Sequence, residues 1–202
     1  MENDVSKVGA KQDGKMLICG IVMPISSIDG CAETHWEEVK SILVDAIKSA
    51  DYEANLVSNA DDVGVIQKRI VQNLYDNDIV VCDVSCKNAN VMFELGLRLA
   101  FDKPTIIVVD DKTGFSFDTS PIEHLVYPRD LRYSKIVEFK NKLKEKIIGT
   151  MKSAADSNYS PFLKHFGEFR VASIEHSEGS VNDVVLQRLD DMQQTIGRLS
   201  FL

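Results

Sequence analysis

The sequence predicts an α/β fold, in which a doubly wound, mainly parallel sheet of five strands is followed by a C-terminal helical appendage. Short apolar runs rich in β-branched residues alternate with amphipathic stretches of helical period, which is typical of parallel strands joined by helices. The first run, at 16–24, is apolar at nearly every position. A strand buried on both faces of a sheet has this composition.

Strands and helices are expected to alternate through the first 150 residues. The strands are predicted at the five apolar runs 16–24, 52–58, 78–85, 105–110 and 124–127. The helices are predicted at the four amphipathic stretches 34–50, 62–74, 91–101 and 134–148. Each of the first three helices therefore connects two strands of one sheet.

Local signals mark the expected helix ends. Thr34 and Glu37 have the spacing of a capping box, which predicts the start of the first helix. Asp62 is expected to cap the second helix. Gly149 is expected to end the fourth helix, because glycine readily adopts the left-handed conformation at a helix C-terminus.

The chain divides into three expected segments. Residues 1–15 are polar and charged and predict a flexible leader, and residues 16–150 form the α/β domain. Residues 151–202 are expected to hold a linker and a helical oligomerisation segment. Its apolar residues alternate four and three apart, as in a short coiled coil: Val185, Leu189, Met192, Ile196 and Leu199. A helix folded back onto its own domain would show the same pattern.

Charge, apolar runs and cysteine spacing each exclude a class of partner or location. With 31 acidic and 23 basic side chains the net charge is −8, and no basic stripe is present, so nucleic acid is not an expected partner. No apolar run is long enough to cross a membrane, and no secretory signal is apparent, so a cytoplasmic location is expected. The four cysteines lack metal-site spacing, and no cofactor or metal is predicted.

The carboxyl ends of the parallel strands are the expected ligand site. On the helix that follows the third strand, Glu94 lies among almost entirely apolar residues. A buried carboxylate without a partner is costly, so Glu94 is expected either to pair with Arg98 one turn later or to act on a ligand. Its place early in the helix favours the ionised form through the helix dipole.

The stretch 78–110 contains a strand ending in Asp83, a polar loop, the run Asn-Val-Met-Phe-Glu-Leu-Gly around Glu94, a Lys-Pro pair and another strand. This order resembles the nucleoside 2-deoxyribosyltransferase superfamily and the related TIR-like proteins, whose sheets are flavodoxin-like. The resemblance implies that Glu94 attacks or stabilises the anomeric carbon while an N-glycosidic bond breaks. It also implies that Asp78 contacts the base.

The resemblance predicts an enzyme that cleaves the N-glycosidic bond of NAD, a nucleoside or a nucleotide. Its catalytic carboxylates are expected to be Glu94, Asp83 and Asp78. The substrate is expected to touch six further residues, namely Pro24, Ser26, Ser27, Asp29, Asn88 and Asn90. The resemblance further implies activation by assembly in bacterial, including antiviral, defence or in a stress pathway. The alternative is a non-catalytic sensor that binds a nucleotide and signals by oligomerising.

Asn88 departs from the transferase pattern. Deoxyribosyltransferases commonly have a second aspartate six residues before the glutamate, where this chain has Asn88. An amide can hydrogen-bond a sugar or a base but cannot transfer a proton. The TIR-like branch tolerates this loss better, which favours NAD as the substrate over base exchange between nucleosides.

Overall fold

The computed structural model describes residues 11–12, 15–58, 66–114, 119, 122–156 and 159–163. The expected cap Asp62 and the expected C-terminal helix lie outside the described residues. Two short strands, β1 (Lys11–Gln12) and β2 (Lys15–Met16), pair antiparallel, so regular structure already begins within the segment expected to be a leader. No helix of the described part of the chain combines the length and apolarity needed to cross a bilayer.

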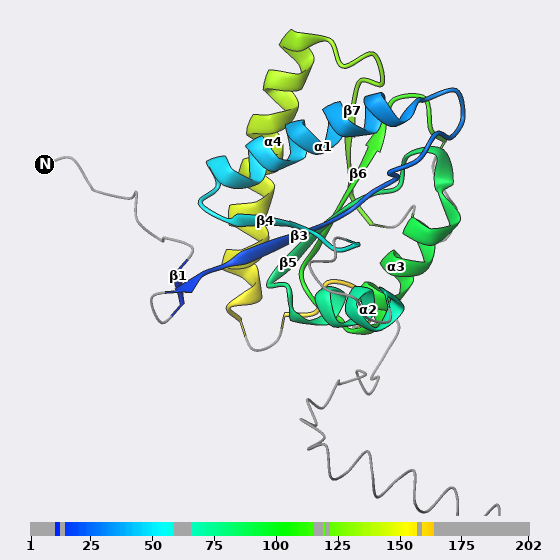
Figure 1. Cartoon of the computed structure of the whole chain (residues 1–202). Helices are drawn as coiled ribbons and strands as arrows, with labels where there is room; N and C mark the ends of the chain where they lie inside the picture. Colours follow the sequence, from blue (N-terminus) through cyan, green and yellow to red (C-terminus); the bar gives the residue numbers. More distant parts are fainter. Residues whose placement is uncertain are drawn as a thin grey trace, which may run out of the picture. The chain divides into compact units, whose positions relative to one another are not determined.

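The main sheet has five strands, and every neighbouring pair is parallel. Its strands are β3 (Ile18–Val22), β4 (Glu53–Leu56), β5 (Ile79–Asp83), β6 (Thr105–Asp110) and β7 (His124–Tyr127). They lie in the order β4-β3-β5-β6-β7 (Figure 1), which is the flavodoxin-like order. The predicted fold class is confirmed. The strand order reverses beside β3, because β4 lies on one side of it and β5 on the other.

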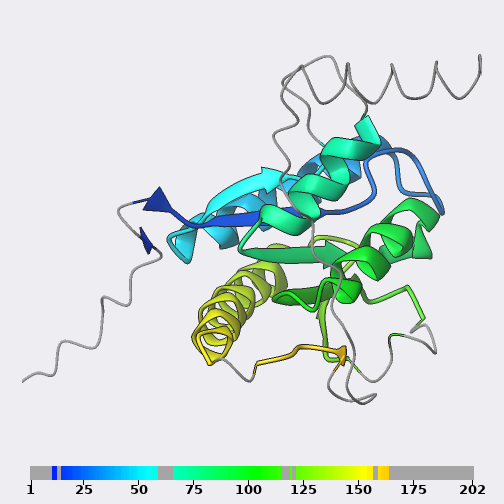
Figure 2. The same cartoon turned by 90° about the horizontal axis from the view of Figure 1, so that it is seen from below.

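Helices cover both faces of this sheet (Figures 1 and 2). The four α-helices are α1 (Glu33–Ser49), α2 (Ile66–Asp76), α3 (Ala89–Ala100) and α4 (Tyr133–Ala154). α1 packs beside α4, and α2 packs beside α3. A short 3-10 helix, η1 (Ser85–Lys87), joins β5 to α3.

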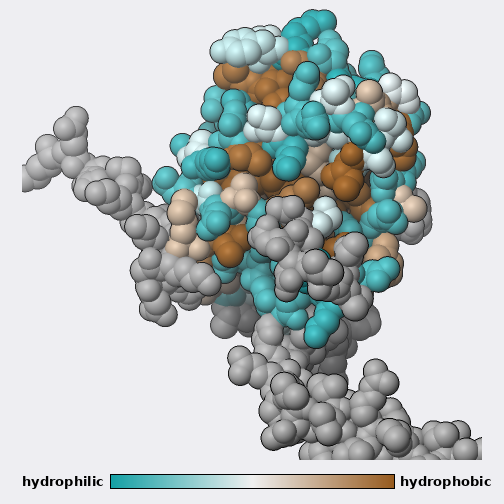
Figure 3. All heavy atoms as spheres, in the orientation of Figure 1, coloured by the Kyte–Doolittle hydropathy of each residue, from teal (hydrophilic) through white to brown (hydrophobic). Residues whose placement is uncertain are grey.

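Burial of the central strands explains why the apolar runs of the sequence predicted them. All five residues of β5 are buried, as expected of a central strand between two helical layers. On one face of the sheet, Trp36 and Leu43 of α1 meet Leu143 and Ile147 of α4 in the main core cluster. Hydrophilic side chains cover much of the face shown in Figure 3, with apolar patches between them.

Two predicted helix ends are wrong. α1 begins at Glu33 and no side chain caps its start, so Thr34 lies inside the first turn, where it is not the N-cap that a capping box requires. α4 continues past Gly149 to Ala154, because Ile147 and Met151 still pack against the core on either side of the glycine. The expected domain boundary at residue 150 therefore falls within a helix.

Candidate functional site

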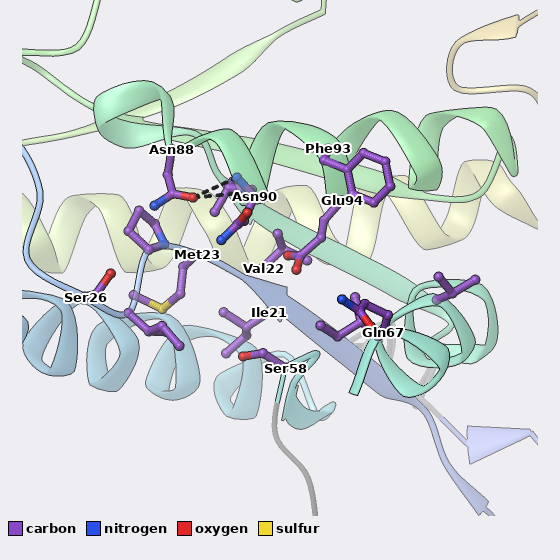
Figure 4. Close-up of a pocket in the computed structure, with 15 residues that line it drawn as sticks. Ile21, Val22, Met23, Ser26, Ser58, Gln67, Asn88, Asn90, Phe93 and Glu94 are labelled. Carbon is purple, nitrogen blue, oxygen red and sulfur yellow. Dashed lines mark hydrogen bonds between the residues drawn. The ribbon is translucent and has the colours of Figure 1, made fainter. Parts of the chain in front are cut away.

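A cavity of about 470 Å³ lies at the carboxyl end of β3, between α2 and α3 (Figure 4). It occupies the point where the strand order reverses, which is where open parallel sheets bind ligands. Its walls come from β3 and the loop after it, the end of β4, α2 and α3. The lining residues are Ile21, Val22, Met23, Pro24, Ile25, Ser26, Ser58, Gln67, Ile70, Val71, Asn88, Asn90, Val91, Phe93 and Glu94.

Glu94 is the one ionisable side chain among the described residues that line this cavity. Its carboxylate points into the cavity (Figure 4) and forms no hydrogen bond or ion pair with any described residue. Partial burial raises the pKa of Glu94 above its ordinary value. α3 begins at Ala89, so Glu94 lies in the second turn, beyond the free N–H groups of the helix start. The predicted stabilisation by the helix dipole is therefore wrong.

The alternative ion pair between Glu94 and Arg98 does not form. Arg98 is fully buried and turns toward backbone carbonyls at the amino end of the sheet. Its Nη1 donates to the carbonyls of Leu74 and Asn77, and its Nη2 donates to that of Pro104 at 2.9 Å. Burial lowers the pKa of Arg98 to about 10. Glu94 is left without a counter-ion on its own helix.

Asn88 shapes the edge of the cavity by capping α3. Its Oδ1 accepts hydrogen bonds from the backbone N–H groups of Asn90, at 3.0 Å, and Val91, at 3.3 Å. The chain reaches this cap through Cys86 and Lys87, two consecutive non-glycine residues with φ of 57° and 50°. Such conformations cost free energy and persist where the surrounding contacts hold them.

Asp83 is near the cavity in sequence but does not line it. The fully buried carboxylate accepts hydrogen bonds from the Ser85 N–H, at 3.0 Å, the Ser85 hydroxyl, and the Tyr127 hydroxyl, at 2.7 Å. Desolvation raises the pKa of Asp83 to about 6 despite these donors. Asp83 therefore does not face the cavity as expected. Its hydrogen bonds to Ser85 instead hold the loop that leads to α3.

Asp78 lies at the wrong edge of the sheet for its expected role. It immediately precedes β5, so it belongs to the amino ends of the strands, whereas the cavity is at the carboxyl end of β3. Its Oδ2 accepts a 2.7 Å hydrogen bond from the Ile18 N–H and thereby ties β5 to β3. A base contact by Asp78 is excluded for this cavity.

Of the four residues predicted to bind substrate from the loop after β3, two line the cavity. Pro24 and Ser26 line the cavity, whereas Ser27 and Asp29 do not. Asp29 instead forms a 3.1 Å ion pair with Arg129 Nη1. The same guanidinium donates from Nε to the buried Asp110 at 2.8 Å, and this contact helps to hold the pKa of Asp110 below its usual range.

Several lining residues were not predicted. Ser58, Gln67 and the apolar rim residues Ile25 and Phe93 were all missed. Ile25 and Phe93 are 57% and 67% exposed, which is unusual for large apolar side chains. Ser58 ends a predicted strand and could have been found by that position, whereas nothing in the local pattern distinguishes Gln67.

No family model and no curated protein matches the chain. The cavity offers one unpaired carboxylate, the side-chain amides of Asn88, Asn90 and Gln67, and an apolar floor. Within the described ranges, no group of three or more His, Cys, Asp or Glu side chains is arranged to hold a metal ion.

Proposed function

We propose that this protein is an enzyme that cleaves the N-glycosidic bond of a nucleoside, a nucleotide or NAD, with Glu94 as the catalytic carboxylate. The observation that carries the proposal is the isolated position of Glu94. It is partly buried, unpaired among the described residues and directed into a cavity of about 470 Å³. Cavities of this size hold small ligands of nucleoside dimensions.

The reaction needs little more than a carboxylate and water. As the C1′–N bond breaks, its electron pair moves to the base nitrogen and positive charge develops on the sugar. The Glu94 carboxylate either stabilises this charge or bonds to C1′. Water then adds its oxygen to C1′, releases a proton to solvent and, in the covalent route, frees the carboxylate. A raised pKa makes the Glu94 carboxylate more basic, which suits both routes.

The amides around Glu94 support binding of a sugar. Asn90 and Gln67 come from α3 and α2, and Figure 4 shows them near Glu94 in the same cavity. Ser26 and Ser58 add hydroxyl groups to its lining. Neutral donors and acceptors of this kind fix the orientation of sugar hydroxyls without adding charge.

The proposal is tested by incubating the full chain with nucleosides, nucleotides and NAD and resolving the products by mass. We expect a free base or nicotinamide to be released, and the Glu94→Gln variant to lose at least about a hundredfold in kcat. Glu37→Gln is the matched control, because Glu37 is exposed on α1 and absent from the cavity. A panel without any product, in dispersed and assembled protein alike, would leave the nucleotide-binding sensor as the better description.

We also propose that the enzyme works in the cytoplasm as a homo-oligomer, and that assembly through residues 180–202 regulates it in a defence or stress response. The heptad-like spacing of that segment supports self-association, although the segment lies outside the described residues. Truncation before Ser180 should reduce the mass of the particle in solution. An unchanged particle mass would reject this segment as the assembly element.

A further inference from the structure

We infer that the preferred substrate is a phosphate-free nucleoside whose base already carries a positive charge, such as an N-ribosylpyridinium. This inference rests on the proposed function and narrows its substrate class. Three features of the cavity support it: the charge of the described lining, the capped start of α3, and the absence, among the described lining residues other than Glu94, of an acid that could protonate a leaving base.

The described lining carries negative charge only. Glu94 is its one ionisable residue, and no Lys, Arg or His is present among the described side chains that face the cavity. A phosphate would therefore meet repulsion, whereas a cation would supply the counter-ion that Glu94 lacks.

The start of α3 is also unsuited to phosphate. Free N–H groups at a helix N-terminus commonly bind such anions. In this protein the N–H groups of Asn90 and Val91 donate to the side chain of Asn88. Two of the N–H donors at this helix end are therefore already occupied by the cap and would have to exchange it for a phosphate.

The third feature concerns the leaving group. A neutral purine or pyrimidine leaves as an anion unless an acid protonates it. Besides Glu94, the described polar side chains in the lining are the amides of Asn88, Asn90 and Gln67 and two serine hydroxyls, none of which is an effective acid. A pyridinium needs no proton, because the electron pair of the breaking C1′–N bond neutralises it. Water supplies the oxygen to C1′, and the proton it releases goes to solvent.

The rim suits a flat cationic ring. Phe93 immediately precedes Glu94 and is 67% exposed at the edge of the cavity, and Ile25 is 57% exposed on the loop after β3. Figure 4 shows the Phe93 ring on the outer side of α3 and the Glu94 carboxylate on the inner side. An aromatic face attracts cations, and Phe93 lines the same cavity as the unpaired carboxylate.

The charge preference is tested first by binding, without turnover. Isothermal titration of the full chain compares 1-methylnicotinamide, a cation, with neutral nicotinamide. We expect the cation to bind at least about tenfold more tightly, and Glu94→Gln to remove this difference while Glu37→Gln keeps it. Equal binding of the two probes by the unmodified protein would overturn the inference.

Turnover then separates the inference from the proposed function. Nicotinamide riboside should give a kcat/KM at least about tenfold above those of its 5′-monophosphate, NAD and inosine. Cleavage of the phosphorylated substrates or of inosine at an equal or higher kcat/KM would overturn the substrate preference and leave the proposed function standing. Absence of product from all four would overturn the proposed function and with it the substrate assignment.

Discussion

Glu94 and Arg98 lie one helical turn apart on α3 but point to opposite ends of the sheet. The Arg98 guanidinium binds backbone carbonyls near the amino ends of the strands, and the Glu94 carboxylate enters the cavity at the carboxyl end of β3. An ion pair between them would have neutralised the site. Because it does not form, the carboxylate stays available to a ligand and destabilises the free protein slightly.

The first prediction follows from this unpaired state. Glu94→Gln should leave the Tm at neutral pH unchanged or raise it by a few degrees, because it removes a partly desolvated charge that has no partner in the described chain. Thermal melts followed by circular dichroism measure this. A fall in Tm of more than about 5 °C would show that the carboxylate stabilises the fold.

The catalytic activity should also depend on pH through Glu94. The ionised form is the active one, and burial raises its pKa, so kcat/KM should fall on acidification at a pH above the ordinary range for glutamate. Rates measured between pH 4 and pH 8 test this. A rate that stays constant down to the ordinary glutamate range would contradict the environment described for Glu94.

Arg98→Lys should destabilise the protein by about 2–4 kcal/mol. An ammonium group cannot reach the carbonyls that the planar guanidinium binds in separate directions, and buried carbonyls without donors are costly. Urea denaturation measures the loss. Arg132→Lys is the control, because Arg132 is exposed and pairs with Asp130 at the surface, so a change within about 0.5 kcal/mol is expected.

The buried Asp83 predicts a pH dependence of stability. Its folded pKa of about 6 lies above that of an unfolded aspartate, so the folded state binds the proton more readily between the two values. The free energy of unfolding should therefore fall as pH rises from about 4 to about 6, by up to about 2–3 kcal/mol from this group.

Asp83→Asn isolates this contribution. Its amide oxygen can still accept from Ser85, and the variant should remove the slope between about pH 4 and pH 6. Asp110 acts in the opposite direction and at lower pH, because contacts such as that with Arg129 lower its pKa and its stabilisation is lost on acidification. An unchanged slope in the variant would assign the effect to another group.

Asn88 should act through its cap. Asn88→Ala is expected to cost about 1 kcal/mol of stability and to weaken ligand binding, because the N–H groups of Asn90 and Val91 lose their acceptor. Asn88→Ser should retain most of both, since a hydroxyl also caps helices. Equal losses in the two variants would indicate that the amide itself contacts the ligand.

Sequence periodicity predicted the sheet well because its three central strands, β3, β5 and β6, are short, apolar and almost entirely buried. The runs at 105–110 and 124–127 match β6 and β7 to the residue. The position of a site residue was harder to predict. Asp78 and Asp83 belong to one predicted strand, but neither lines the cavity. Asp78 binds the Ile18 N–H at the amino end of the sheet, and the buried Asp83 binds Ser85 and Tyr127, which are contacts that a local pattern does not contain.

The groups that bind Arg98 also could not be predicted from residue spacing along the helix. Spacing along α3 suggests Glu94, whereas the carbonyls it binds come from α2 and the segments beside β5 and β6. Pro24, Ser26, Asn88, Asn90 and Glu94 line the cavity, and the first four follow the end of a strand or lie at the start of the next helix. Their contact with substrate stays a prediction. Gln67 is the second residue of α2, but the predicted helix began at residue 62 and therefore did not indicate Gln67 as a residue of the helix start.

Two ion pairs of Arg129 stabilise the loop after β3, which forms one wall of the cavity. By pairing with both Asp29 and Asp110, Arg129 joins the loop after β3 to the end of β6. Directed evolution toward new ligands should therefore accept changes most easily on the opposite wall, at Gln67 and Val71, which do not belong to these ion pairs. Substitutions at Arg129 should change ligand preference and expression level together, although Arg129 is not among the residues that line the cavity.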